Sequence, residues 1–165
     1  MSAVLVMPPA FHQAPAIEPP APMPLDQLSA RMARLLAYWH CRRGDKEMAA
    51  RADIDPLDMA FALGALVLFD VEGEGQYRYR VYGSDFVDRL RRELTGLSLD
   101  SHPEKSQIPL MRRSLNEAVA ARRPIARRGA KLVQGEVRRY AGLFLPLSAD
   151  QCRVDQILMM VELRA

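Results

Sequence analysis

Residues 66–83, LVLFDVEGEGQYRYRVYG, place two runs of strand-forming residues on either side of a glycine-containing turn. The first run is almost entirely apolar, which is typical of a buried strand. The second run alternates, so Tyr77, Tyr79 and Val81 are expected on one face of a sheet and their neighbours on the other. Two such runs around a short turn predict an antiparallel hairpin. The apolar face of that hairpin has to be covered by other parts of the chain.

Helix signals and three further strand-like runs follow the hairpin. Ser84 or Asp85 can cap a helix that extends to about Thr95, and a longer helix is expected over residues 108–121. The later strands are expected at about 126–133, 137–147 and 154–162. This order predicts an α+β fold, a five-stranded antiparallel sheet with helices packed on one face.

An amphipathic helix is predicted before the hairpin, over residues 26–43, with Asp26 as N-cap and Gly44 at its end. A second, short helix is expected over residues 55–63. The stripe of the first helix has to be buried, either on the domain itself or against a second copy of the chain in a homodimer. Its apolar members at helical spacing are Leu28, Met32, Leu35, Leu36 and Trp39.

Composition limits the class of protein. The chain has 165 residues, 49% of them hydrophobic and 26% charged, which suits one globular domain over residues 25–165. Prolines crowd residues 1–24, and we expect these residues to be a disordered Pro/Ala-rich leader, because proline excludes a helix or a central strand there. No segment approaches the ~18–20 apolar residues of a membrane span, and Cys41 and Cys152 are far apart. These features predict a cytoplasmic protein without a membrane span or a metal site.

Short segments spread over the chain read LLAYW (35–39), RADIDPLD (51–58), YRYRVYG (77–83), ELTG (93–96), RRY (138–140), LPLS (145–148) and VDQIL (154–158). In this order and spacing they resemble a bacterial PAS-domain family that is common in alphaproteobacteria. The resemblance covers about residues 30–162.

The resemblance implies a PAS fold and a sensory or regulatory role rather than catalysis. Because 165 residues leave no room for an output domain, we expect a stand-alone module that binds a signalling partner or itself. The sequence identifies no cofactor.

The resemblance also implies a candidate small-molecule site between the sheet and the helices. Arg92 or Arg113 would be the polar handle of an anionic ligand. The residues that could line the site, or simply form the core, are Tyr79, Val81, Phe86, Leu90, Met111, Leu115, Phe144 and Leu158.

Two other functions remain open from the residues. Residues 86–140 carry a surplus of basic side chains in five Arg-Arg pairs, which would suit a nucleic acid or nucleotide if the pairs converged. They fall on different predicted elements and match no nucleic-acid motif, so nucleic acid is not the expected partner. His102 is the one histidine placed to act as an axial ligand in a haem-dependent sensor. Since no catalytic motif occurs, we do not expect an enzyme.

Overall fold

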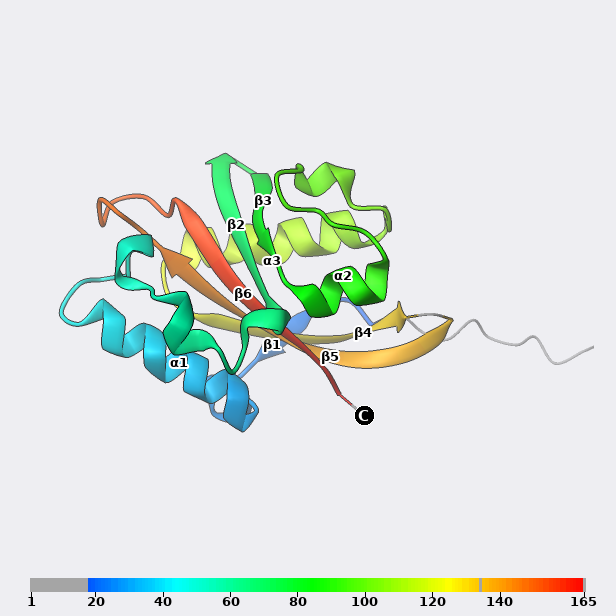
Figure 1. Cartoon of the computed structure of the whole chain (residues 1–165), viewed down its shortest axis with the longest axis horizontal. Coiled ribbons are helices and arrows are strands. Elements are labelled where there is room, and N and C mark those ends of the chain that lie inside the picture. The colour runs from blue at the N-terminus through cyan, green and yellow to red at the C-terminus, as the bar shows by residue number, and fades with distance from the viewer. Residues whose placement is uncertain (1–17, 134, 165) are drawn as a thin grey trace, which may run out of the picture.

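A six-stranded antiparallel sheet runs through the computed structural model, which describes residues 18–133 and 135–164 (Figure 1). The strand order is β1-β4-β5-β6-β2-β3. The strands are β1 (Ala21–Met23), β2 (Leu66–Gly73), β3 (Gln76–Tyr82), β4 (Ile125–Val133), β5 (Glu136–Leu147) and β6 (Gln156–Arg164). The predicted α+β architecture with an antiparallel sheet is confirmed, with one strand more than expected.

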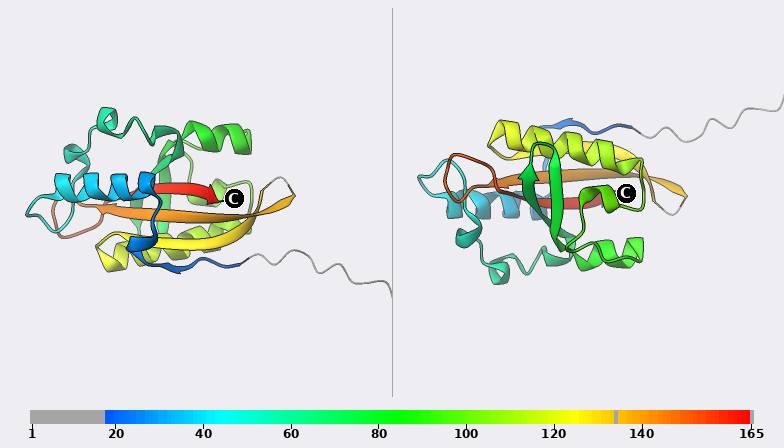
Figure 2. Two further views of the ribbon diagram at one scale, coloured as in Figure 1. Left: turned by 90° about the horizontal axis from the view of Figure 1, so that it is seen from below. Right: turned by 90° about the horizontal axis from the view of Figure 1, so that it is seen from above.

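The two faces of the sheet are covered by different helices. Helix α3 (Gln107–Ala121) lies across one face and α1 (Ala30–Arg43) across the other (Figure 2). Helix α2 (Ser84–Leu90) follows β3 directly. The strand residues alternate accordingly: Val67, Phe69, Met159 and Val161 lie towards α3, whereas Leu66, Leu68 and Leu158 face the α1 side. The extra N-terminal helix therefore buries the face that the other helices leave uncovered.

Helix α1 begins later than the sequence predicts. Ser29 is its N-cap, and the Ser29 hydroxyl accepts a hydrogen bond from the backbone N–H of Met32 at 3.2 Å. Asp26 lies instead in a short 3-10 turn, Leu25–Gln27. Gly44 ends the helix with a φ of 57°, as expected.

The apolar stripe of α1 packs on the chain's own sheet. Met32, Leu35 and Trp39 are buried, and the Trp39 indole N–H donates to the carbonyl of Pro146 in β5 at 2.9 Å. Leu28 and Leu36 are partly buried against the same core. Of the two alternatives for the stripe, burial on the domain itself therefore holds for the three buried members, whose side chains have no exposed surface for a homodimer contact.

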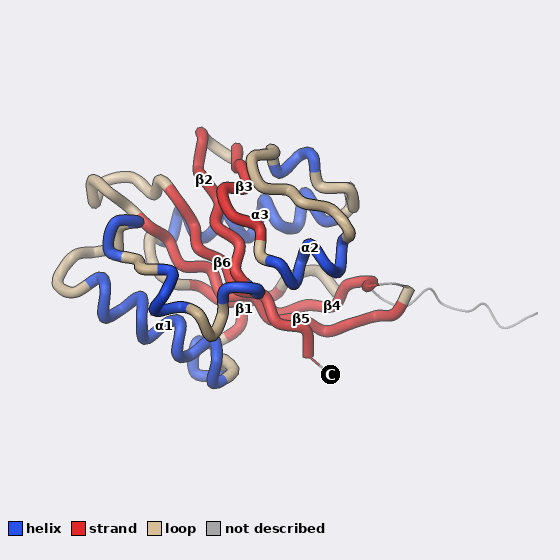
Figure 3. The backbone as a smooth tube through the Cα atoms, in the orientation of Figure 1, coloured by secondary structure: helices blue, strands red, loops and turns tan. Residues whose placement is uncertain are grey.

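The chain between α1 and β2 consists of short helical turns joined by loops (Figure 3). The predicted helix over 55–63 is in fact two 3-10 turns, Pro56–Met59 and Leu63–Ala65. Asp55 does cap the first of them, accepting from the N–H of Leu57 at 2.9 Å. A third turn, Arg51–Asp53, precedes them.

The end of the predicted leader belongs to the sheet. Strand β1 pairs with β4, with Ala21 opposite Arg128 and Met23 opposite Ala126. Pro22 is tolerated because β1 is an edge strand, where a missing N–H costs no ladder hydrogen bond. The rest of that leader, residues 1–17, lies outside the described residues.

Helix α2 is shorter than predicted and ends at Leu90, where Arg91 adopts a φ of 56°. The residues after α2 run back alongside β3. The backbone N–H of Tyr79 donates to the carbonyl of Leu97 at 2.9 Å, and the backbone N–H of Gly96 donates to the carbonyl of Tyr79 at 2.6 Å. A further 3-10 turn, Leu99–Ser101, leads to α3. Within the described part of the chain, no helix has both the length and the apolar character needed to cross a membrane.

Candidate functional site

A cavity of about 330 Å³ lies between the sheet and helices α2 and α3. Its volume is at the lower end of the range of small-molecule sites. Strands β2, β3, β4 and β6 form one side of it, and the opposite side comes from α2, α3 and the segment between them. The lining is mixed, with an aromatic wall and a group of charged and polar side chains.

Four neighbouring rings, in tilted and edge-to-face contacts, form the aromatic wall. The ring centroids of Phe69 and Tyr79 are 4.9 Å apart, those of Tyr79 and Tyr82 are 5.3 Å apart, and those of Tyr82 and Phe86 are 5.4 Å apart. The series continues from β2 through β3 into α2. It offers an apolar aromatic surface to the body of a ligand.

A β-bulge in β3 brings Tyr82 into this wall. Leu68 pairs with Val81 and the next residue, Phe69, pairs with Tyr79, so Arg80 is an extra residue that breaks the alternation. Beyond the bulge, residues that strict alternation would place on one face of the sheet lie on the other face. Tyr82 joins Tyr79 in the cavity, and Val81 turns to the opposite face, where it is 47% exposed.

Two tyrosine hydroxyls in the cavity have no hydrogen-bond partner among the described residues, those of Tyr79 and Tyr82. By contrast, the hydroxyl of nearby Tyr77 donates to the side-chain carbonyl of Asn116 at 2.6 Å. Tyr79 is only 2% exposed. Burial raises the pKa of Tyr79 and raises the pKa of Tyr82 to about 12, so both hydroxyls are neutral donors at physiological pH.

Two cationic side chains also line the cavity, Lys131 from β4 and Arg89 from α2. Neither forms an ion pair within residues 18–133 and 135–164. Burial lowers the pKa of Lys131 and the positive charge of Arg89 lowers it further, while the negative charge of Glu104 opposes both effects. Each cation lies close to an aromatic ring. The guanidinium of Arg89 lies 5.4 Å from the ring centroid of Phe86, and the ammonium of Lys131 lies 5.5 Å from the ring centroid of Tyr140.

The remaining polar lining comes from the segment before α3. The Nδ1 atom of His102 lies 3.1 Å from the backbone N–H of Glu104, and burial lowers the pKa of the imidazole, which favours its neutral form. Glu104 is exposed, and Gln107 is the first residue of α3. These groups can bind and orient a ligand, but they include no nucleophile paired with a base.

The predicted pocket residues divide into three groups. Tyr79, Phe86, Leu90 and Met111 line the cavity. Leu115 of α3 and Phe144 of β5 do not line it, although both are buried. Val81 and Leu158 lie on the α1 side of the sheet, where they line a smaller apolar cavity of about 100 Å³. The bulge moves Val81 there, and strand alternation places Leu158 opposite to its neighbours Ile157 and Met159.

The predicted polar handles lie elsewhere. Arg92 is exposed beyond the end of α2, and Arg113 is exposed on α3, 3.6 Å from Glu117. The cationic side chains that line the cavity are instead Lys131 and Arg89. A lysine in an otherwise small and apolar part of β4 was the available signal for Lys131, whereas nothing in the sequence separates Arg89 from the other arginines near it.

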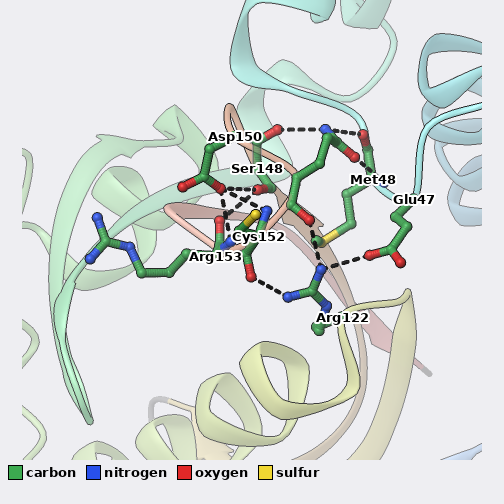
Figure 4. Close-up of polar contacts among 8 residues, drawn as sticks. Glu47, Met48, Arg122, Ser148, Asp150, Cys152 and Arg153 are labelled. Atoms are coloured by element: carbon green, nitrogen blue, oxygen red, sulfur yellow. Dashed lines mark hydrogen bonds and ion pairs between the residues drawn. The ribbon is translucent and has the colours of Figure 1, made fainter.

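A second group of polar residues gathers around Arg122, at the end of α3 (Figure 4). The guanidinium of Arg122 donates to the carbonyls of Gln151, at 2.8 Å, and Cys152, and it pairs with Glu47 at 2.6 Å. The Gln151 side chain in turn donates to the carbonyl of Met48 and accepts from its N–H, both at 3.0 Å. We call Glu47, Met48, Arg122, Gln151 and Cys152 the Arg122 cluster. It connects α3, on one face of the sheet, to the segment that follows α1, on the other.

Other arginines of the basic segment are also engaged with acidic groups. Arg112 pairs with Asp100 at 2.6 Å, Arg138 pairs with Glu136 at 2.7 Å, and Arg127 contacts Glu117. These contacts are distributed over α3, β4 and β5, so the Arg-Arg pairs form no single array. The described residues also contain no cluster of histidine, cysteine or carboxylate side chains suited to a metal ion.

Comparisons with known proteins agree with this geometry. A protein-family model described as a PAS domain matches residues 28–161. Among solved structures, the PAS domain of BvgS from Bordetella pertussis is similar, with a TM-score of 0.51 over 68% of this chain and 88% of that chain. The two sequences are 16% identical, so this likeness concerns the fold. No curated protein sequence matches the chain.

Proposed function

The chain belongs to the PAS domain family, whose members are sensory and regulatory rather than enzymatic, and on that premise we propose that it senses a small molecule held in the cavity between its sheet, α2 and α3. The observation that carries this proposal is the cavity itself. It combines an aromatic wall with the hydroxyl of Tyr79, a residue that is only 2% exposed, and this hydroxyl has no partner within the described chain. A ligand in the cavity would supply a hydrogen-bond partner for this hydroxyl.

Sensing requires that occupancy changes the rest of the molecule, and α3 offers a route. Gln107 and Met111 of α3 line the cavity, and the far end of the same helix leads into Arg122 and its cluster. A ligand that favours one position of α3 would thereby favour one arrangement of the Arg122 cluster, which is a population shift. We propose that a protein partner, either a signalling protein or a second copy of the chain, reads that arrangement by contact.

The first test is to fill the cavity. Met111→Trp should occupy the space meant for a ligand, whereas Leu57→Trp changes a residue that is 82% exposed and lies outside the cavity. Freshly purified wild-type protein and the Leu57 variant should show a mass excess by native mass spectrometry, or a rise in unfolding temperature with a member of a metabolite panel. The Met111 variant should show neither, while retaining the same circular dichroism.

Two results would count against the proposal. One is a bare chain mass together with no thermal response to any member of the panel. The other is equal binding by the Met111→Trp variant. Visible absorbance that His102→Ala abolishes would instead establish the haem-dependent alternative, since His102 lines the same cavity.

A second measurement tests transmission. Hydrogen exchange of residues 47–48 and 148–153 should slow or quicken when the ligand binds, because these residues belong to the Arg122 cluster or to its loop. Unchanged exchange there, with protection confined to the cavity, would contradict the proposed route.

A further inference from the structure

We propose that the ligand of this cavity carries one carboxylate on an apolar or aromatic body, with the carboxylate bound by Lys131 and Arg89. The inference rests on the proposed sensing function and adds to it a chemical class. Three features of the cavity point to this class: its uncompensated charge, its donor-rich lining and its aromatic wall.

The charged side chains that line the cavity leave one positive charge in excess. Lys131 and Arg89 are positive, Glu104 is negative, and His102 is held neutral by burial. Neither cation has an acidic partner within 4 Å in the described chain. A half-buried ammonium without a directly paired carboxylate is unfavourable, and one negative charge from a ligand would balance the site.

A single carboxylate balances this charge better than a phosphate does. A dianionic group would replace one excess positive charge with one excess negative charge inside a partly desolvated space. A carboxylate also accepts several hydrogen bonds at once, from an ammonium and from a guanidinium.

The uncharged lining favours the same ligand. The free hydroxyls of Tyr79 and Tyr82 are neutral, so they can donate hydrogen bonds to an oxygen acceptor of the ligand. The rings of Phe69, Tyr79, Tyr82 and Phe86 provide a continuous apolar surface for the rest of the molecule. A cavity of about 330 Å³ suits a compact molecule such as an aryl acid or a short aliphatic acid.

The experiment compares acids with their uncharged amides. The probes are phenylacetate and hexanoate, the corresponding amides phenylacetamide and hexanamide, and phenyl phosphate, with binding measured by calorimetry and by the shift in unfolding temperature. We expect at least one acid to bind tenfold or more tightly than its amide, because hydrogen bonds to charged groups are worth about twice those between neutral groups. Phenyl phosphate should bind more weakly than phenylacetate.

Substitutions assign the preference to residues. Lys131→Met keeps the length of the side chain, and it should reduce the acid-to-amide ratio to near one while the amide still binds. Arg89→Gln should lower the ratio in the same direction. Arg92→Met and Arg113→Met remove exposed cations outside the cavity, so they should leave the ratio unchanged.

The outcomes separate the two proposals. Amides that bind as tightly as acids, or a Lys131→Met variant that keeps the acid preference, would overturn the inference and leave a sensing cavity in place. Preference for the phosphate would overturn it in favour of a dianion. No binding by any probe, with a bare chain mass in native spectra, would overturn the sensing function as well. The unfolding temperature of Lys131→Met guards against a folding defect, since removal of a poorly solvated ammonium should raise it.

Discussion

Gly83 allows close backbone packing at the point where β3 leads into α2, the helix that contributes to the cavity. It lies between β3 and α2, where the backbone of the Leu63–Ala65 turn and of β2 comes close. A Cβ atom at this position would lie 2.6 Å from the carbonyl oxygen of Leu66 and would also meet that of Gly64. Since both neighbours are backbone atoms, they cannot rotate away as a side chain could.

Gly83→Ala is therefore expected to lower the free energy of unfolding by about 2–3 kcal/mol, in the range of overpacked sites. Gly73→Ala is the matched control, because its added Cβ would meet nothing within 4 Å. Urea unfolding followed by the fluorescence of Trp39, the only tryptophan, measures both variants. Equal stability of the two variants would show that the backbone around Gly83 adjusts freely.

Helix α3 is the element that connects the cavity to the rest of the fold. Its first residue lines the cavity, and its last residue is followed by Arg122, which has a φ of 55°. The Arg122 side chain is held by two carbonyls of the β5–β6 loop and by Glu47. The neighbouring Arg123 is exposed and makes no hydrogen bond or ion pair to the part of the chain that the structure describes.

This pair of arginines allows a direct comparison. Arg122→Ala should lower the free energy of unfolding by about 1–2 kcal/mol, because two carbonyls and a carboxylate lose a charged donor that is only partly exposed to water. Arg123→Ala should change stability by less than about 0.5 kcal/mol, as is usual for surface substitutions. Denaturant unfolding at one pH and salt concentration checks both. A larger effect at Arg123 would contradict the contacts assigned to Arg122.

At the scale of the whole molecule, tyrosine burial couples stability to alkaline pH. Burial raises the pKa of Tyr77 and of Tyr82 to about 12, and it also raises the pKa of Tyr79 and of Tyr140. In the unfolded chain these phenols ionise near pH 10. Between these values the folded state holds protons that the unfolded state has lost, so unfolding releases protons.

The free energy of unfolding should therefore fall as the pH rises from about 10 towards 12, with each affected phenol adding up to about 1.4 kcal/mol per pH unit. Tyr82→Phe removes one of these groups and should make the decline shallower. Urea titrations at pH 8, 10, 10.5 and 11 provide the measurement. A stability that stays constant up to pH 11 would be inconsistent with this account.

The sequence predicted the features of this fold that depend on local patterns. The β2–β3 hairpin, the long helix over 108–121 and the three C-terminal strands lie close to where alternation and helical spacing place them. The cap at Asp55 and the end of α1 at Gly44 follow from residue chemistry in the same way. The resemblance to PAS domains combined these elements into the correct family.

The candidate cavity could be predicted only in part. Tyr79, Phe86, Leu90 and Met111 were found because alternation and helical spacing mark apolar faces. Val81 was predicted to line the cavity, but Tyr82 lines it instead because of the bulge at Arg80. That bulge depends on how β3 pairs with β2, and alternation alone does not reveal it. Arg92 and Arg113 were named as polar handles and Arg89 was not, because surface arginines look alike in sequence.

Local periodicity thus determined which segments of this chain become strands and helices, since each residue's preference acts over one or two turns or one strand. Tertiary structure alone decided that Pro22 joins the edge of the sheet, that the stripe of α1 is buried on β5, and that Lys131 faces a cavity opposite Arg89. Each of these depends on contacts between segments far apart in the chain. Their geometry is fixed only when the sheet closes against both layers of helices, because strand register and packing then allow one arrangement of the buried groups.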